Sequence, residues 1–423
     1  MPASSPTPRR SFIKKTALAA SALAAAGTAS GQGAGKRKFK RTSPSSAELI
    51  EVGVLTATGG HIDAIWGPLI NPADGKSRMT GMVMTQAWDI DSEALDRFAK
   101  KFDVKKASRY DAMVGKVDAV ILSDFGSLFW YQDLARPYLE AGVPIFINRP
   151  FASSLVNARD MIETAKKGGA PVMCGSSLEY VQAVESIREA LPDLGEITGY
   201  VADNAQSDYA THGVHGIYFV YACVGGGVRT VSYQAEDWTR PNGAMTFEYK
   251  GRNGGNVFWG LLMQAYRSGS AWIRVNGKGT SKRGDGYSND VSIERQMDWP
   301  REGRGFVTDS AIWLPMIHAM QRMFETGNMP EPYENIFEKT QMFIGGFYSL
   351  LEKKGAPVAL EDIPLGWECP NNRPPMDPNR YPKGYFNPSL TVTPHFLGIL
   401  RGSMSKKQQL TSIYHSKNRS VIK

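Results

Sequence analysis

Two histidines stand at the start of an apolar segment in the middle of the chain. His212 and His215 are two of only six histidines, and the apolar run behind them ends in the three glycines 225–227. If residues 209–224 form a helix, a spacing of three residues puts both imidazoles on one face. Histidine titrates near neutral pH and can exchange a proton with a substrate hydroxyl. The pair therefore predicts acid/base or substrate-orienting chemistry, with Tyr209 as a further orienting group.

Two other interpretations of these histidines stay open. Both imidazoles can be structural side chains whose hydrogen bonds are satisfied inside a core. They can also ligate a metal ion, which needs a third ligand from another part of the chain. The acidic candidates for that ligand are Asp208, Glu179 and Asp237. We predict no metal site, because the pair alone does not make one.

The segment before these histidines alternates strand and helix patterns. Buried strands are expected at 48–56, 80–88, 118–123, 143–148 and 170–175. Strands separated by helices at this spacing predict a Rossmann-like, doubly wound parallel sheet over residues 48–176. Ligands of such sheets bind at the carboxyl ends of the strands.

The pattern changes after Gly195 to strands without long helices between them. These strands are expected at 196–202, 228–234, 245–249, 256–260 and 271–275. They predict an α/β domain over residues 177–363 with an open, mostly antiparallel sheet and the helix 209–224 on one face. Helices 309–326 and 334–353 close this domain, and residues 364–423 form an irregular C-terminal tail.

The turn after the first strand is where a dinucleotide pyrophosphate would sit. Gly59, Gly60 and His61 occupy this turn, although a complete Gly-x-Gly-x-x-Gly pattern is absent. Asp89 ends the second strand, where a carboxylate can accept hydrogen bonds from a ribose. The alternatives are a tight turn without a ligand and, for the acidic pair, a helix cap formed by Asp91.

Polar residues also follow the third and fourth strands. Asp124 comes after the strand 118–123, and Asn148, Arg149 and Pro150 end the strand 143–148. Arg149 would point a fixed positive charge into the cleft, and Pro150 stiffens the turn. We place all four residues beside the cofactor, and the alternative for Arg149 is an ion pair with a surface carboxylate.

Composition limits the classes of function. The 423 residues are 42% hydrophobic, which is enough for two domains with cores. The net charge of +8 comes largely from lysines and arginines near the two ends, so no nucleic-acid-binding face is predicted. Three widely spaced cysteines form no zinc or redox pair, and no apolar run of membrane-spanning length follows the leader.

The N-terminal leader carries an export pattern. Arg9 and Arg10 precede Phe12, Ile13 and a weakly hydrophobic stretch that ends near Ala29. Residues 1–30 resemble a twin-arginine signal peptide, followed by a flexible linker at 31–47. The resemblance implies export of the folded protein to the periplasm by the twin-arginine machinery.

The whole layout from residue 48 to 363 resembles the Gfo/Idh/MocA oxidoreductase family, and especially its exported branch. The resemblance rests on three segments: 61–71, 141–152 and 213–225. It implies a Rossmann domain, a second domain with an open sheet, and a tightly held NAD or NADP. It also implies a sugar or cyclitol substrate and a homo-oligomer that pairs through the open sheet.

Family positions that carry chemistry differ here. Arg149 replaces the usual lysine before proline, and Thr211 replaces an aspartate often found four residues before the histidine that matches His215. Arginine stays protonated, so Arg149 can bind an anionic group or polarise a carbonyl but is a poor proton shuttle. The glycine pattern of the cofactor turn is also incomplete.

Three hypotheses follow. The first is an exported oxidoreductase in which His215 exchanges the hydroxyl proton, His212 or Tyr209 orients a sugar-derived alcohol, and Arg149 holds or polarises it. The second is a carbohydrate-binding protein that kept the fold and lost the reaction. Three tryptophans are available to stack on sugar rings: Trp238, Trp259 and Trp272. The third is a sugar lyase or hydratase that uses the histidines with or without a metal.

Overall fold

The computed structural model describes residues 49–57, 61–75, 78–89, 91–123, 128, 130–204, 209, 213–236, 238, 243–250, 257–264, 271–279, 291–296 and 310–369. They belong to one compact unit that begins at residue 43. The predicted signal peptide, the linker and the tail beyond Cys369 lie outside the described residues. Four predicted site residues also lie outside them: Gly59, Gly60, Asp124 and His212.

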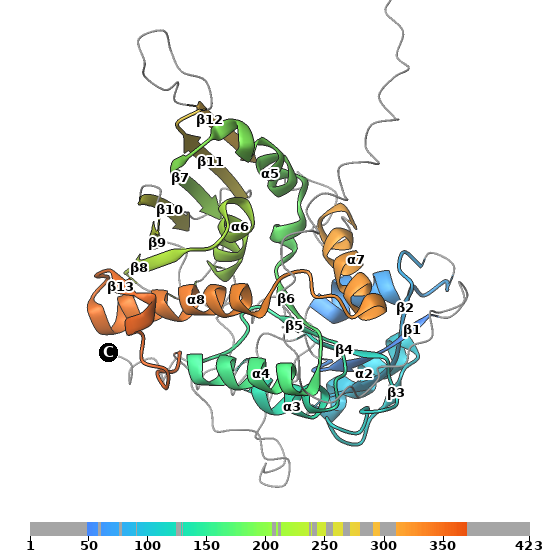
Figure 1. Ribbon diagram of the computed structural model, residues 1–423. Coiled ribbons are helices and arrows are strands. Elements are labelled where there is room, and N and C mark those ends of the chain that lie inside the picture. Colours follow the sequence, from blue (N-terminus) through green and yellow to red (C-terminus); the bar gives the residue numbers. More distant parts are fainter. Residues whose placement is uncertain are drawn as a thin grey trace, which may run out of the picture. The chain divides into compact units, whose positions relative to one another are not determined.

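The first sheet is parallel and doubly wound (Figure 1). Its strands are β1 (Ile50–Leu55), β2 (Met82–Trp88), β3 (Lys105–Lys106), β4 (Ala119–Leu122), β5 (Ile145–Asn148) and β6 (Val172–Gly175). The strand order is β3-β2-β1-β4-β5-β6, and every pair is parallel. The direction of winding reverses between β1 and β4, where a Rossmann sheet opens its ligand crevice. The predicted fold class is confirmed for this half of the chain.

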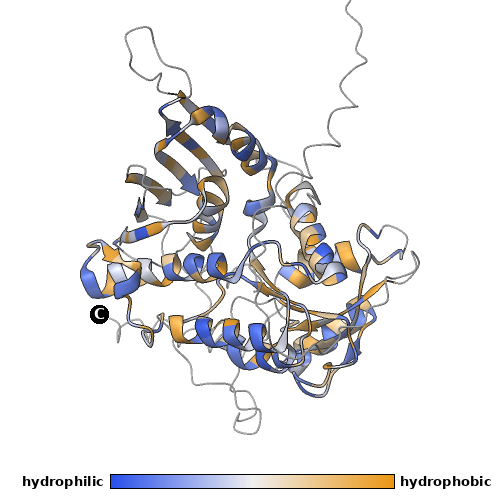
Figure 2. Cartoon of the chain, in the orientation of Figure 1, coloured by the Kyte–Doolittle hydropathy of each residue, from blue (hydrophilic) through white to orange (hydrophobic). Residues whose placement is uncertain are grey.

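Helices cover both faces of this sheet. They are η1 (Ile62–Trp66), α1 (Gly67–Ile70), α2 (Ser92–Phe102), α3 (Tyr131–Glu140) and α4 (Leu155–Gly168). The strands of this sheet carry mostly hydrophobic residues, drawn in orange in Figure 2, because both faces are buried. Asp91 caps α2 by accepting a hydrogen bond from the Ala94 backbone, so the capping alternative is confirmed for this aspartate.

The second sheet is mixed and mostly antiparallel. After η3 (Ser177–Tyr180) and α5 (Gln182–Leu194), it is built from β7 (Ile197–Asn204), β8 (Val228–Gln234), β9 (Gly243–Tyr249), β10 (Phe258–Gln264), β11 (Ala271–Gly277), β12 (Val291–Gln296) and β13 (Val358–Ala359). The strand order is β12-β11-β7-β10-β9-β8-β13. Only the β7–β10 pair is parallel among the described pairs, so the predicted open, mostly antiparallel sheet is confirmed.

Helix α6 (Val214–Val224) carries the family-matched histidine and packs against β7 and β10. All of its residues are buried, so the helix is enclosed on every side and no single face is directed to solvent. A Cβ atom at Gly216 would meet Leu262 and Asn204 at 2.9 and 3.0 Å, so glycine lets the helix approach the sheet closely at the residue after His215. Gly225, with φ +83°, ends the helix.

The last two long helices pack in different places. Helix α7 (Ser310–Thr326) follows the second sheet in sequence but joins the hydrophobic cluster on the first sheet, beside η1 and β6. Helix α8 (Tyr333–Lys353) packs against β8, α4 and α6, followed by the short η7 (Leu360–Asp362). Within the part of the chain that is described, no helix has the length and hydropathy needed to span a membrane.

Candidate active site

Three predicted residues meet beyond the carboxyl end of β5. Arg149 is 1% exposed and is joined to the buried Pro150 by a cis peptide bond. Its Nε and Nη2 atoms lie 3.0 and 2.5 Å from Nε2 of His215, and its Nη1 lies 3.1 Å from Nδ1 of His61. One guanidinium therefore contacts an imidazole from each half of the chain.

These contacts determine which ring nitrogens carry protons. A guanidinium has only N–H donors and stays protonated, so both imidazole nitrogens that face Arg149 must accept. His215 in its neutral form then carries its proton on Nδ1, and His61 carries its own on Nε2. The basic nitrogen of His215 points at Arg149.

Asn148 connects this group to the neighbouring strand. Its Oδ1 accepts a hydrogen bond from Nη1 of Arg149 at 2.8 Å, and its Nδ2 donates to the Ser123 backbone carbonyl at 2.7 Å. The same Nδ2 lies 3.2 Å from Nδ1 of His61. A donor on one side and a carbonyl on the other fix the amide orientation. Asn148 thus links the ends of β4 and β5 at the predicted site.

The other nitrogen of His215 faces the end of β6. Its Nδ1 lies 2.5 Å from Oγ of Ser176, which also accepts a hydrogen bond from the Leu178 backbone at 3.1 Å. The Ser176 backbone N–H donates to Oε2 of Glu179 at 2.8 Å, and these two residues form the capping box of η3. The sequence contains the signal for this motif, a serine followed three residues later by glutamate, directly after a predicted strand.

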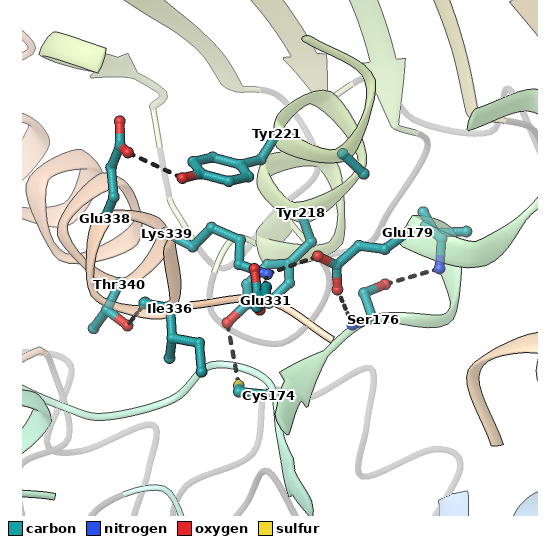
Figure 3. Close-up of polar contacts among 12 residues, drawn as sticks. Cys174, Ser176, Glu179, Tyr218, Tyr221, Glu331, Ile336, Glu338, Lys339 and Thr340 are labelled. Carbon is teal, nitrogen blue, oxygen red and sulfur yellow. Dashed lines mark hydrogen bonds and ion pairs between the residues drawn. The ribbon is translucent and has the colours of Figure 1, made fainter. Parts of the chain in front are cut away.

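Behind Glu179 lies a buried ion cluster (Figure 3). Nζ of Lys339, on α8, lies 2.7 Å from both Glu179 Oε1 and Glu331 Oε1 and 4.3 Å from the ring centroid of Tyr218. Burial raises the pKa of Glu179 to about 7, and Lys339 offsets this only in part. Burial alone would lower the pKa of Lys339, but the two carboxylates outweigh it and hold that pKa above its ordinary value.

The turn after β1 has an unusual backbone. Thr56 adopts φ +63°, a left-handed conformation that is rare for a β-branched residue and costs on the order of 1–3 kcal/mol. Its N–H donates to the Trp88 carbonyl at 2.9 Å, and its carbonyl accepts from Oγ of Ser123 at 2.8 Å. The turn is therefore tied to both neighbouring strands at the crevice.

Asp89 lies where a ribose carboxylate is expected. It is buried at the end of β2, and its Oδ1 accepts a hydrogen bond from the Asp91 backbone at 2.8 Å. The preceding Trp88 is buried and packs edge-on against Tyr110, with ring centroids 5.7 Å apart. The left-handed turn at Thr56, the crevice and the Asp89 carboxylate together fit a dinucleotide.

His61 begins the first helical turn and borders the same crevice. Its ring stacks on Trp66, with ring centroids 5.1 Å apart, and contacts Trp313 of α7, with ring centroids 5.4 Å apart. His61 therefore lies next to Arg149, near the point between β1 and β4 where a Rossmann sheet binds its ligand.

Tyr209 lies in the core instead of in this group. Its ring stacks on Tyr233 and Phe343 with centroids 4.4 and 5.4 Å apart, and its hydroxyl donates to the Phe343 carbonyl at 2.7 Å. Burial raises the pKa of Tyr209 well above its ordinary value. The substrate-orienting role predicted for Tyr209 gains no support from this position.

No group of three or more metal-ligating side chains occurs among the described residues. Glu179, one of the proposed third ligands, is engaged with Ser176 and Lys339. The other two candidates, Asp208 and Asp237, lie outside the described residues.

Comparison with known proteins finds a family match within the Rossmann-like domain. Residues 59–176 match the GFO_IDH_MocA family model. That model describes an oxidoreductase family with an NAD-binding Rossmann fold. The matched segment is the Rossmann-like sheet, and the match supports a nicotinamide dinucleotide as its cofactor.

A sequence relative and two solved structures extend the comparison. D-apiose dehydrogenase of Paraburkholderia graminis is 26% identical over 148 residues, which are 33% of this chain and 40% of that protein. A putative myo-inositol dehydrogenase from Sinorhizobium meliloti has a TM-score of 0.55 at 14% identity, covering 74% of this chain and 100% of that one. Myo-inositol dehydrogenase from Lactobacillus casei, solved with NAD(H) and myo-inositol, has a TM-score of 0.57 at 15% identity, covering 74% and 96%. The structures show that both sheets share the fold of these proteins. The match to D-apiose dehydrogenase covers less than half of that protein's length.

Proposed function

We propose that the protein is an exported, NAD(P)-dependent oxidoreductase that acts on a sugar or a sugar-derived alcohol. The contact between Arg149 and His215 carries this proposal, because it joins a fixed cation and a titratable base at the carboxyl end of β5. The family match and the sugar and inositol dehydrogenases among its relatives support the substrate class.

The two side chains divide the work on the alcohol. A bound nicotinamide dinucleotide supplies the hydride acceptor. The substrate hydroxyl replaces Arg149 at Nε2 of His215 and passes its proton to that nitrogen while the carbon loses its hydride. Arg149 cannot take the proton, so it donates hydrogen bonds to the oxygen as the carbonyl forms. In the reverse direction His215 returns the proton to the oxygen.

The remaining site residues hold the cofactor and the substrate. We propose that Asp89 binds the ribose of the cofactor. We propose that the rest of the dinucleotide is bound by Gly59, Gly60, His61, Asn148 and Asp124. Pro150 stiffens the turn that follows β5, and we assign to His212, two residues before α6 in the sequence, the orientation of the substrate. We also propose, from Arg9 and Arg10 of the predicted signal peptide, that the protein is exported to the periplasm with its cofactor retained. A homo-oligomer that pairs through the open face of the second sheet completes the proposal.

Cofactor content and turnover test this function. Denaturing the purified protein should release a dinucleotide that absorbance and mass identify. A panel of sugars and cyclitols should then reduce added NAD or NADP, and His215→Ala should lower turnover by about 10²–10⁴-fold. His318→Ala is the matched control, because that histidine contacts the Met79 carbonyl from α7. Absence of both dinucleotide and turnover in the wild-type protein would refute the proposal.

A second candidate is a carbohydrate-binding protein without turnover. It is favoured by the contact in which Arg149 donates to the one His215 nitrogen that would act as the base. Trp259, 50% exposed on β10, offers a ring for stacking on a sugar. Calorimetry should then show sugar binding that is equal in the wild type and His215→Ala, with no nicotinamide reduced.

A further inference from the structure

The contact between Ser176 and His215 has no role in the reaction just described. Oγ of Ser176 lies 2.5 Å from Nδ1, on the opposite side of the ring from Arg149. We propose that Ser176, held in place by Glu179 and Lys339, is the positioning residue that aims His215 at the substrate. This inference rests on the proposed function for the chemistry that His215 performs.

The hydrogen bond that Nδ1 of His215 donates to Ser176 restrains the imidazole ring, which the contact with Arg149 alone does not. A donor at Nε2 fixes one edge of the ring, and the Ser176 acceptor fixes the other, so rotation about the Cβ–Cγ bond breaks two contacts instead of one. Both residues are buried, so without the serine the Nδ1–H would lose this acceptor in a place where water does not readily replace it. The serine matters most when the substrate displaces Arg149, because it is then the remaining protein contact of the two.

Ser176 is itself fixed from two directions. Its backbone N–H donates to Glu179, and its hydroxyl accepts from the Leu178 backbone. The capping box of η3 therefore holds Oγ of Ser176 at the first turn of η3. The Glu179 carboxylate uses its second oxygen to bind Lys339. The capping box thereby connects a buried charge on α8 to the serine that faces His215.

Lys339 also contacts the helix that carries His215. Tyr218, whose ring lies 4.3 Å from its Nζ, follows His215 by three residues on α6 and therefore lies on the same side of that helix. One ammonium group thus contacts both Glu179, which holds Ser176, and α6, which holds the histidine (Figure 3). These contacts set the separation between the end of β6 and the first turn of α6.

Nuclear magnetic resonance of protein labelled with ¹⁵N-histidine tests the contact without any assay of turnover. The wild type should show a downfield Nδ1–H proton, assigned to His215 by its loss in His215→Gln. Ser176→Ala should abolish this signal, Ser176→Thr should restore it, and Ser177→Ala, at the neighbouring buried serine, should leave it unchanged.

Kinetics of the same variants tests the consequence. Ser176→Ala should lower kcat by about 10–100-fold with little change in KM, as expected when a reacting group is misplaced by a fraction of an ångström. Ser176→Thr should recover most of kcat, and Ser177→Ala should match the wild type. If Ser176→Ala fails to fold, Glu179→Gln serves instead, and a weakened Nδ1–H signal with lowered kcat is expected.

The outcomes separate this inference from the proposed function. A downfield signal that persists in Ser176→Ala, or a kcat within about twofold of Ser177→Ala, would overturn the positioning role. Loss of the signal in a protein that never reduces a nicotinamide would support the contact while refuting the oxidoreductase proposal.

Discussion

Two buried cations are connected to His215, Arg149 directly and Lys339 through Glu179 and Ser176, and their surroundings differ. Arg149 is 1% exposed, and the acceptors described for it include two imidazole nitrogens and an amide oxygen. Lys339 is 0% exposed and lies between two carboxylates. Arg149 therefore contacts neutral groups that can form other hydrogen bonds, whereas Lys339 contacts carboxylates whose negative charge it balances.

The difference indicates which cation can take part in a reaction. Neutral acceptors such as His61 and His215 can give up a hydrogen bond to a substrate hydroxyl at little cost, because the substrate offers an equivalent bond. The carboxylates of Glu179 and Glu331 would be left as buried charges if Lys339 moved, which costs several kcal/mol. Arg149 is therefore suited to contact a substrate during a reaction, and Lys339 is suited to stabilise the fold.

Removing the lysine should have the largest effect on stability. Lys339→Met leaves two buried carboxylates without their cation, and we expect the free energy of unfolding to fall by about 3–5 kcal/mol. Urea unfolding followed by circular dichroism measures it. Lys353→Met, at an exposed position on the same helix, is the control and should change stability by less than about 0.5 kcal/mol. A loss below about 1 kcal/mol for Lys339→Met would remove the distinction between the two cations.

Removing the arginine should affect turnover more than stability. Arg149→Met leaves neutral acceptors behind, so its stability loss should be smaller than that of Lys339→Met. The oxygen of the substrate loses its donor, and we expect kcat to fall by about 10²–10³-fold. Initial rates with saturating cofactor measure this, and Arg149→Lys should recover part of the rate. A variant that unfolds as readily as Lys339→Met would show that Arg149 is structural.

The carboxylate beside the lysine should make stability depend on pH. The pKa of Glu179 rises from 4.5 to about 7 on folding, so the folded protein binds this proton more tightly than the unfolded chain. Stability from this group is therefore present below the ordinary pKa of 4.5 and is lost as the pH rises through the folded-state pKa. Urea unfolding at several pH values should show this decline, and Glu179→Gln should flatten it. An equal slope in both proteins would contradict the assignment.

The smallest effect should come from the end of α8. Lys354 is exposed and caps this helix with φ +55°, a conformation that glycine adopts without strain. Lys354→Gly should raise the free energy of unfolding by about 0.5–1 kcal/mol and leave kcat unchanged. Thermal unfolding and initial rates check both. A changed kcat would mean that turnover follows global stability, and the contrast between the two cations would lose its force.

Local patterns were enough to predict most of the fold. Strand 228–234 has the predicted limits, because it has a clear period and a clear terminal signal. The packing of α7 on the first sheet was not predictable in this way, since its apolar face fits a core on either sheet. Strand β12 and the parallel pairing of β7 with β10 in the second sheet were not predicted either, because they depend on partners distant in sequence.

The site was predictable where residues end strands. Asn148 and Arg149 were predicted from their place at the end of a strand, and His215 from its place at the start of an apolar helix and from the family resemblance. The structure brings them together with His61. Ser176 was missed although its capping motif is visible in the sequence, because nothing local shows that a cap faces a histidine 39 residues away. Lys339 was missed because a lysine in a helical pattern is normally solvent-exposed.

The position of Lys339 late in the chain has a consequence for biosynthesis. Ser176 and His215 are made early, but the ammonium that holds both segments is residue 339 of 423. A nascent chain that has not yet released α8 from the ribosome has strands and a histidine but no fixed separation between them. The separation between these two segments is therefore fixed only after α8 has left the ribosome, later than the strands of the Rossmann sheet.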